Sequence, residues 1–598
     1  MLCLFSRDAL LPRAQTVQES GTPCCQVDKA APREVDFPYY SLRDGFNSNL
    51  LLVGASPKPT DFVVAVHALS GRTLLSPTLT IQSGEKRSLD LRAFLNELGA
   101  DVNGDFAEGS VAVYFNGTVM PLPGQLTLSN PARGLSLESE MVDNSPGLGL
   151  LPAALNALWW GLGGGRDAKI MVSNTSGDSV TADVFLDFQG ERHASAPLSL
   201  SPHETKVLSV IQLLGELRAS PAQAPQGGIT IVGRGAKAVL IAQGKITDAS
   251  TGFSTSLNFM DPALQKASAM HASGVPIGLP SKDSPYTGTG VFIPHVIVRN
   301  LAGSPQSASI TLEYPGDKEP QQVRLAPIPL GAYATEDLAL DSAFGLLPLP
   351  LPFCSIRIQY SGPPGSAIGE VSSVESKGDL VIDSRLANER DGWAGAGGHP
   401  WHLDEETESI MFLTNMGDRP ARIGFDVVAL ATHYYLTKLK LQPHETRAID
   451  LRKLRDAQKP DFKRNTIPPE ASDGSVIWSR LDHVPVMGRL VVLERHKGMS
   501  SNYDCGICDC PAAYVDLEVE PYSVVTNQGG YAYLDAEAKF DEYCNSYYWW
   551  CSVPASRTSL NPSVATVDEW GDIRGVSGGS ASIKATYSDC YYTFDSQT

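Results

Sequence analysis

The chain has 598 residues and a mass of 64.0 kDa, which corresponds to about three to six domains. Charged residues make up only 19%, and the 54 glycines and 42 prolines exceed average usage, which favours turn-rich β structure over coiled coils and helical solenoids. The net charge of −19 argues against a nucleic acid or an anionic membrane surface as the partner.

The N-terminal segment does not resemble a complete secretory signal. Met1–Gln15 starts apolar but reaches Arg7 and Asp8 before an apolar core of about seven residues is complete. We expect that the true start lies upstream; the alternative is a chain that is not exported by that route. Residues 1–35 carry no periodicity and are expected to form a flexible leader. No run of about 18 apolar residues occurs anywhere, so no integral membrane span is expected.

A charged turn segment recurs roughly every 120 residues along the chain. Leu200–Leu213 and Leu441–Leu454 both contain Pro-His-Glu-Thr, and weaker copies begin at Gly84 and Gly331. The anchors of the four copies are placed at Gly84, His203, Gly331 and His444. Because this spacing is the size of a whole domain, the copies indicate tandem domains rather than a solenoid.

Other features recur at fixed places in each copy. An aromatic-x-Leu motif precedes a short apolar strand, an Asn/Gly turn follows, and then comes a strand of alternating apolar and polar residues. The motifs are Tyr40-x-Leu42, Trp160-x-Leu162 and Trp401-x-Leu403, and the alternating strands are Phe62–Leu69, Thr181–Phe188, Ala308–Tyr314 and Ile423–Leu430. Many short strands separated by turns at 8–12-residue spacing are typical of a β-sandwich.

We therefore predict an all-β protein: a tandem array of immunoglobulin-like or fibronectin-like β-sandwiches with a few short helices. The helices are expected after the charged turns, at Leu91–Leu98, Leu208–Leu217 and Leu451–Ala457. The predicted sandwiches span residues 36–145, 146–277, 278–393 and 394–503, followed by a different domain at 504–598 with a Cys-rich hinge. Four such domains joined by short connections are expected to form a long rod or an arc.

The C-terminal segment has the pattern of a known family. Asn561–Asp568 contains Val-Ala-Thr-Val and is followed by Gly575-Val576, by the pair Gly578-Gly579 and by an alternating strand. This pattern resembles the bacterial immunoglobulin-like domain, group 2. The resemblance implies a small β-sandwich of a kind found in surface-exposed and secreted bacterial proteins, including adhesins. The four upstream copies look similar to uncharacterised secreted proteins of environmental bacteria, which implies a location but no activity.

Six of the ten cysteines lie in the last 94 residues: Cys505, Cys508, Cys510, Cys544, Cys551 and Cys590. A local even set in a domain of this kind predicts two or three disulfides and an oxidising compartment. Cys544 and Cys551 are one possible pair, and Cys590 could reach back to the Cys505–Cys510 hinge, but six cysteines allow 15 pairings. The alternatives are a zinc site on Cys505-x-x-Cys508-x-Cys510, although the second ligand arm is missing, and free thiols.

Two clusters are candidates for chemistry or binding. His399 and His402 lie close to Asp404 and two glutamates, yet the motif around Trp401 also occurs in copies without histidines, which favours a structural role. The run Tyr547, Tyr548, Trp549 and Trp550 is the best binding candidate, because an exposed aromatic platform suits sugars or a protein partner. Adjacent strand residues face opposite sides, so both tryptophans cannot enter one core.

These observations predict a non-catalytic, secreted or cell-surface β-sandwich repeat protein that acts in adhesion or as an envelope scaffold. The expected partner is an unknown protein or glycan, with no metal and no cofactor. Two alternatives stay open: a carbohydrate-binding or substrate-targeting protein that uses the aromatic run, and an extracellular hydrolase with a site near His399 and His402. The sequence does not decide the oligomeric state or the mode of anchoring.

Overall fold

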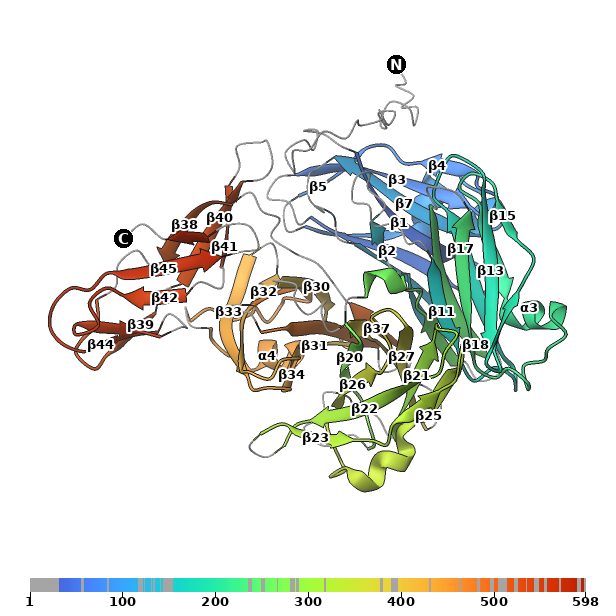
Figure 1. Ribbon diagram of the computed structural model, residues 1–598. Helices are drawn as coiled ribbons and strands as arrows, with labels where there is room; N and C mark the ends of the chain where they lie inside the picture. Colours follow the sequence, from blue (N-terminus) through green and yellow to red (C-terminus); the bar gives the residue numbers. More distant parts are fainter. Residues whose placement is uncertain are drawn as a thin grey trace, which may run out of the picture.

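The computed structural model confirms an all-β architecture of many small antiparallel sheets (Figure 1). The structure describes residues 32–598 except 55–58, 83–84, 117–121, 123, 131, 133–134, 140, 144–153, 235–238, 249–252, 266, 280–285, 287–289, 317–318, 377–379, 389–395, 430–431, 462–463, 481–483, 495–498, 504–513, 521–524, 534, 542–547, 553–555, 569–571, 589–592 and 596–598. No helix in this part of the chain is both long and apolar enough to cross a membrane.

The first unit is a sandwich of two sheets, ordered β10-β1-β7-β3-β4, with β5 also on β3, and β6-β2-β8-β9. Residues 32–35, assigned above to the leader, belong to β1 because they pair with the end of β7. The elements are β1 (Pro32–Ser41), β2 (Asn47–Val53), β3 (Thr60–Ala68), β4 (Thr73–Leu75), β5 (Leu79–Ile81), β6 (Lys86–Asp90), α2 (Leu91–Glu97), η1 (Asp105–Ala107), β7 (Glu108–Asn116), β8 (Gly124–Asn130), β9 (Leu135–Ser139) and β10 (Val142–Asp143).

The second unit repeats this strand order, with sheets β11-β17-β13-β14, where β15 also pairs with β13, and β16-β12-β18-β19. Its elements are β11 (Leu155–Trp159), β12 (Arg166–Asn174), β13 (Val180–Phe188), β14 (Glu191–Ala194), β15 (Leu198–Leu200), β16 (Thr205–Ser209), α3 (Val210–Glu216), β17 (Gly227–Arg234), β18 (Leu240–Asp248), β19 (Phe253–Leu257) and η3 (Pro262–Leu264).

The third unit has sheets β23-β22-β26-β20-β29, with β24 on β22, and β25-β21-β27-β28. Its first strand, β20, lies within the range assigned above to the second sandwich, but it pairs with β26 of the third. The elements are β20 (Ala269–Val275), β21 (Phe292–Asn300), β22 (Gln306–Tyr314), β23 (Gln321–Arg324), β24 (Ile328–Leu330), β25 (Thr335–Ala339), η4 (Leu340–Leu346), β26 (Cys354–Tyr360), β27 (Ala367–Glu375), β28 (Val381–Arg385) and β29 (Ala387–Asn388).

The fourth unit has sheets β30-β35-β32-β33 and β34-β31-β36-β37. Where the other units have two short strands at the edge of the first sheet, this unit has the single long strand β33. The elements are β30 (Ala396–His402), β31 (Thr407–Asn415), β32 (Ala421–Ala429), β33 (Thr432–Leu441), β34 (Thr446–Asp450), α4 (Leu451–Asp456), β35 (Asp473–Arg480), β36 (Val486–Glu494) and β37 (Met499–Tyr503).

The C-terminal unit differs from the four repeats and consists of three small sheets, β38-β40-β41, β39-β44-β43 and β42-β45-β46. In Figure 1 it lies (red) beside the fourth unit (orange), away from the first two. Its strands are β38 (Tyr514–Glu520), β39 (Tyr531–Tyr533), β40 (Asp535–Asp541), β41 (Tyr548–Ser552), β42 (Ser556–Ser559), β43 (Ala565–Val567), β44 (Asp572–Gly575), β45 (Ile583–Ser588) and β46 (Thr593–Asp595).

The predicted short helices form directly after the strands that follow the charged turns. Asp90, Ser209 and Asp450 are the N-caps of α2, α3 and α4, and each side chain accepts a hydrogen bond from a backbone N–H of the first turn. A capping side chain satisfies one of the otherwise unpaired N–H groups at a helix start. In the third unit Ala339 stands at the cap, makes no side-chain cap bond, and is followed by the 3₁₀ helix η4.

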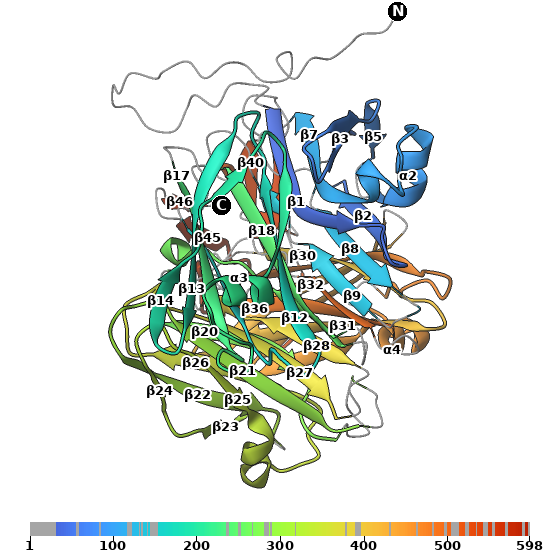
Figure 2. The same cartoon turned by 90° about the vertical axis from the view of Figure 1, so that its right-hand side faces the viewer.

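The four repeats form a closed ring, not the rod or open arc expected from tandem domains. The last strands of the units lie side by side in the order β9, β19, β28 and β37, and β37 returns to β9. The first strand of each of the first three units packs on the second sheet of the following unit: β1 on β12 and β18, β11 on β21 and β27, and β20 on β31 and β36. Figure 2 shows β9, β28 and β31 gathered in the middle of the four units.

Candidate functional site

The predicted aromatic site lies partly outside the described residues. Tyr547 is not described, whereas Tyr548, Trp549 and Trp550 lie in β41, the edge strand of the sheet β38-β40-β41. In the register of this sheet Trp549 is opposite Phe540, and Trp550 is opposite Lys539. The two tryptophans therefore belong to opposite faces of the sheet.

Most of the predicted disulfide cysteines also lie outside the described residues: Cys505, Cys508, Cys510, Cys544 and Cys590. Cys551 is in β41, opposite Ala538. Cys354 is buried at the start of β26 as a free thiol, as its apolar surroundings in the sequence indicate, and burial raises the pKa of this thiol.

The His399 and His402 pair does not form a joint site. His399 is fully buried and accepts a hydrogen bond from Trp478 Nε1 at 3.1 Å, so that Nε2 is an acceptor in the core. His402 lies three residues along β30, partly exposed, with Nε2 3.3 Å from Asp404. Within the described ranges no group of three or more His, Cys, Asp or Glu side chains could hold a metal ion.

The Pro-His-Glu-Thr turns are structural, and the histidines have a particular role in them. His203 and His444 adopt a positive φ, and Glu204 and Glu445 each accept a hydrogen bond from the backbone N–H three residues earlier. Positive φ is uncommon for residues other than glycine. In the third unit Tyr333, rather than Gly331, holds this conformation, so the equivalent anchor is two residues later than expected from the sequence.

Successive units are joined by both apolar and polar contacts. In the second unit, the middle of the second strand, β12, is buried on both faces. Ile170 and Val172 lie in the core of their own unit, whereas Met171 lies in the core of the first unit. Ile297 likewise enters the core of the second unit, and Phe412 packs with Phe353 of the third unit. The second, third and fourth units therefore each pack an apolar side chain of this strand against the preceding unit, and the third adds Ile368.

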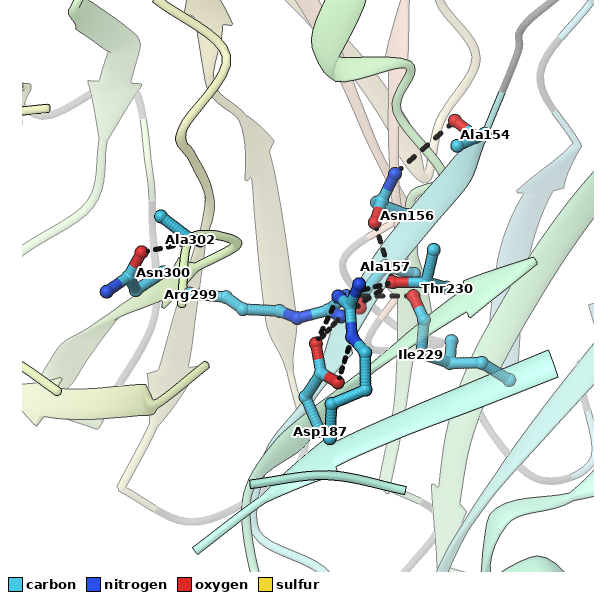
Figure 3. A network of polar contacts seen from close by, with 10 residues as sticks. Ala154, Asn156, Ala157, Asp187, Ile229, Thr230, Arg299, Asn300 and Ala302 are labelled. Carbon is cyan, nitrogen blue, oxygen red and sulfur yellow. Dashed lines mark hydrogen bonds and ion pairs between the residues drawn. The ribbon is translucent and has the colours of Figure 1, made fainter. Parts of the chain in front are cut away.

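The interface between the second and third units is built around the buried Arg299 at the end of β21 (Figure 3). Its Nη1 donates to the carbonyl oxygens of Ala157 at 2.6 Å and Ile229 at 2.8 Å. Its Nη2 donates to Asp187 Oδ2 at 2.5 Å and to Thr230 Oγ1 at 2.9 Å. Burial lowers the pKa of Arg299 to about 10, and the charge and hydrogen bond of Asp187 oppose that shift.

A second arginine shares the same carboxylate. Arg192 donates from Nε and Nη2 to the two oxygens of Asp187, at 2.9 and 2.8 Å, and its guanidinium lies 4.6 Å from the ring centre of Tyr333 in the third unit. Two arginines and one carboxylate thus close this interface, and all four polar partners of Arg299 belong to the second unit.

The interface between the third and fourth units uses a different arginine, the buried Arg489 on β36. Its Nη1 donates to the Ser273 carbonyl at 2.5 Å, and its Nη2 donates to the Asp383 carbonyl at 2.7 Å. Thr414 and Thr446 continue the contact through hydroxyl hydrogen bonds to Ser273 and Ser355.

The interface between the first and second units is held by aromatic rings and one buried lysine. Lys245 Nζ on β18 lies 5.4 Å from the ring centre of Tyr39 and 4.9 Å from that of Phe46. The imidazole rings of His67 and His203 stack with their centres 4.6 Å apart. The Tyr39 hydroxyl donates to Glu108 at 2.5 Å, and Glu108 also pairs with Arg43 at 3.0 Å.

The contact that closes the ring, between the fourth and first units, is made by the strands β37 and β9. Leu51 alternates with Leu50 and Leu52 of the first core and is itself buried, at the position that Met171, Ile297 and Phe412 take in the other units. Lys86, which opens β6, lies within electrostatic range of Asp473, which opens β35; burial lowers the pKa of Lys86, and the charge of Asp473 opposes that shift.

These interfacial charges were missed by the sequence analysis, although the sequence carries a signal for them. A charged residue inside an otherwise apolar strand, such as Arg299 after Val296–Val298 or Arg489 before Leu490–Leu493, indicates a buried partner. What the arrangement can do chemically is to fix the relative orientation of the units, because both Nη atoms of Arg299 and of Arg489 donate to groups of the preceding unit. No protein-family model matches the chain, and a search of curated proteins finds no significant match.

Proposed function

We propose that the chain is a non-catalytic, secreted or cell-surface β-sandwich repeat protein that acts in adhesion or as an envelope scaffold. The observation that carries the proposal is the set of contacts at the unit interfaces. Arg299, Arg489 and Lys245 are each committed to holding two units together. A scaffold requires a fixed geometry of this kind, and a buried charge that lost its partner would be costly.

The family resemblance of the C-terminal unit supports the location. We infer that this unit is a group 2 bacterial immunoglobulin-like domain placed next to the ring of four sandwiches. Arg422 on β32 lies 3.8 Å from Asp572 on β44, which ties the unit to the fourth repeat. Six cysteines in its sequence favour an oxidising compartment.

The proposal is tested by limited proteolysis of intact cells that express the chain. We expect added protease to cleave the protein on unbroken cells, or the protein to be found in the medium, while a cytoplasmic marker stays intact. Purified chain, labelled and added back, should bind the envelope fraction saturably, and heat-unfolded chain is the control. Protein that is cleaved only after lysis, or turnover of glycan, ester or peptide substrates by the purified chain, would contradict the proposal.

A second candidate function, binding of carbohydrate, is favoured by the register of β41. Trp549 shares its face of the sheet with Phe540, Ala538 and Leu517, an apolar set, whereas Trp550 shares the other face with Lys539 and Asp516. An aromatic residue among charged neighbours at a sheet edge suits stacking on a sugar ring. On this account Trp550→Ala abolishes retention on immobilised glycans, whereas Trp549→Ala lowers the stability of the unit; loss of retention in neither variant rejects the site.

A further inference from the structure

One position of the third strand meets the next unit in each of the three interfaces between consecutive repeats. His67 on β3 stacks on His203, Asp187 on β13 pairs with Arg299, and Glu313 on β22 pairs with His444. The positions are equivalent because each lies opposite the same site on the neighbouring strand of its sheet, which is β7, β17 or β26. The residues at that site are Ser110, Gly228 and Ser355. A buried carboxylate therefore faces a permanent cation in one interface and a titratable imidazole in another.

His444 lies between two carboxylates that come from different units. Its Nδ1 is 3.1 Å from Glu313 Oε1 of the third unit, and its Nε2 is 3.0 Å from Asp418 Oδ1 of its own unit. The Nε2 contact is a hydrogen bond, whereas the Nδ1 contact is a close charge pair. A neutral imidazole carries only one N–H, so both contacts are favourable together only when the ring carries two protons.

The two carboxylates differ in their surroundings. The Glu313 side chain is only 1% exposed, whereas Asp418 is 95% exposed. The amide of Gln322 donates to Glu313 Oε1 at 3.1 Å, and among the described residues His444 is the only cation within ion-pair distance of Glu313. An unpaired buried carboxylate is expensive, so the interface depends on the charge of His444.

The remaining charged groups around His444 do not replace that charge. Glu445, the next residue, binds Arg447 at 2.6 Å, and the thiol of Cys354 near Glu313 is a buried neutral group. Hydrogen bonding to Glu313, followed by the charges of Glu313 and Asp418, outweighs burial and raises the pKa of His444.

We propose that the interface between the third and fourth units is a pH-sensitive joint, closed when His444 is protonated and loosened when it is neutral. Because the pKa of His444 is raised on folding, its stabilisation of this interface is fully present below the ordinary histidine pKa of 6.5. It is lost as the pH rises through the folded value. In the neighbouring joint between the second and third units, Asp187 is paired with arginines, which stay charged in this range. The histidine of that joint, His295, stacks on Trp160 and pairs with Asp337, so the control is confined to the segments around Asp187 and Tyr333.

Hydrogen exchange of the full chain between pH 5.5 and 8, corrected for intrinsic exchange, tests the proposal. We expect peptides covering residues 310–316 and 442–448 to lose protection several-fold as the pH rises. Peptides covering 185–190 and 331–335, at the arginine joint, should keep theirs and serve as the internal control. Equal pH dependence at the two joints overturns the proposal.

Two variants separate the joint from general stability. His444→Gln is expected to remove the pH dependence and leave peptides 310–316 and 442–448 weakly protected at every pH. If that chain does not fold, Asp418→Asn changes an exposed residue only and should shift the loss of protection to lower pH. Wild-type behaviour in both variants, or an unshifted profile in Asp418→Asn alone, contradicts the assignment to His444.

Discussion

At the scale of single residues, the ring depends on charged side chains that are buried at the interfaces. Arg299 and Asp187 are both fully buried and form part of one hydrogen-bonded network. Such pairs contribute little net stability compared with apolar packing, but breaking one of them is costly because the other charge stays buried. The pair therefore specifies orientation more than it adds stability.

Asp187→Asn tests this reading. The asparagine keeps the size and one acceptor but leaves Arg299 buried without its counter-charge, so we expect a loss of about 3–5 kcal/mol in the free energy of unfolding. Denaturant unfolding followed by circular dichroism measures it. Asp183→Asn is the matched control, because Asp183 lies on the same strand and pairs with Arg234 at the surface. A loss no larger than that of the control would show that the buried pair does not hold the interface.

Lys245 gives a residue-scale prediction that depends on pH. Burial, with the like charge of Lys169, lowers its pKa to about 8 from an ordinary 10.5, against the charges of Glu108 and Asp44. Between these two pH values the unfolded chain binds more protons than the folded chain, so the contribution of Lys245 to stability rises with pH. We expect the difference in unfolding free energy between wild type and Lys245→Met to shift in favour of wild type from pH 8 to 10. Stability curves that run parallel with pH for the two proteins would contradict a lowered pKa of the buried Lys245 amine.

At the scale of elements, the sequence predicts strands and short helices well but not the second buried face of a strand. Alternation in Thr181–Phe188 and Ile423–Leu430 matches β13 and β32. The helices α2 and α4 start at the expected residues, and α3 starts two residues later than expected. The apolar runs Ile170–Val172 and Ile410–Leu413 have no alternation, and a continuous run is typical of a strand buried on both faces. That signal indicates packing between units, but not which unit supplies the second face.

For the aromatic-x-Leu motif and the Asn turns, the local sequence was enough to predict their structural role. Trp160 and Trp401 are buried in the cores of their units. Asn174, Asn300 and Asn415 each donate from Nδ2 to two or more backbone carbonyls of the following turns. The sequence was enough to place the aromatic candidate site on a strand. Which residues share a face with each tryptophan could be assigned only from the register of β40 and β41.

A pair of glycine substitutions tests the packing of strands between units. A Cβ at Gly228 on β17 would lie 1.9 Å from Arg299 Nε, whereas a Cβ at Gly215 in α3 would meet nothing within 4 Å. We expect Gly228→Ala to displace Arg299 and to cost about 1–3 kcal/mol of stability. Gly215→Ala should gain about 0.5–1 kcal/mol, because alanine is the better helix former. Equal effects in the two melting curves would contradict the close approach at Gly228.

At the scale of the whole molecule, the closed ring is the feature that sequence alone did not reveal. Tandem repeats with short connections are compatible with a rod, an arc or a ring, and the choice depends on the rotation between successive units. The three covalently connected interfaces fix that rotation, and the fourth, between β37 and β9, closes the circle. The first strand of each of the first three units packs on the second sheet of the next unit, and the last strands β37 and β9 make the contact that closes the ring.

Small-angle X-ray scattering of the purified full chain tests the ring most directly. A compact chain of 598 residues has a radius of gyration of about 25 Å, and the closed ring predicts a value close to this, somewhat enlarged by the C-terminal unit. Leu51→Asp, which places a charge at the buried position equivalent to Met171, Ile297 and Phe412, should raise the value measurably while leaving the secondary structure unchanged. A wild-type radius about twice the compact value, with the scattering profile of a rod, would contradict the ring and the scaffold geometry derived from it.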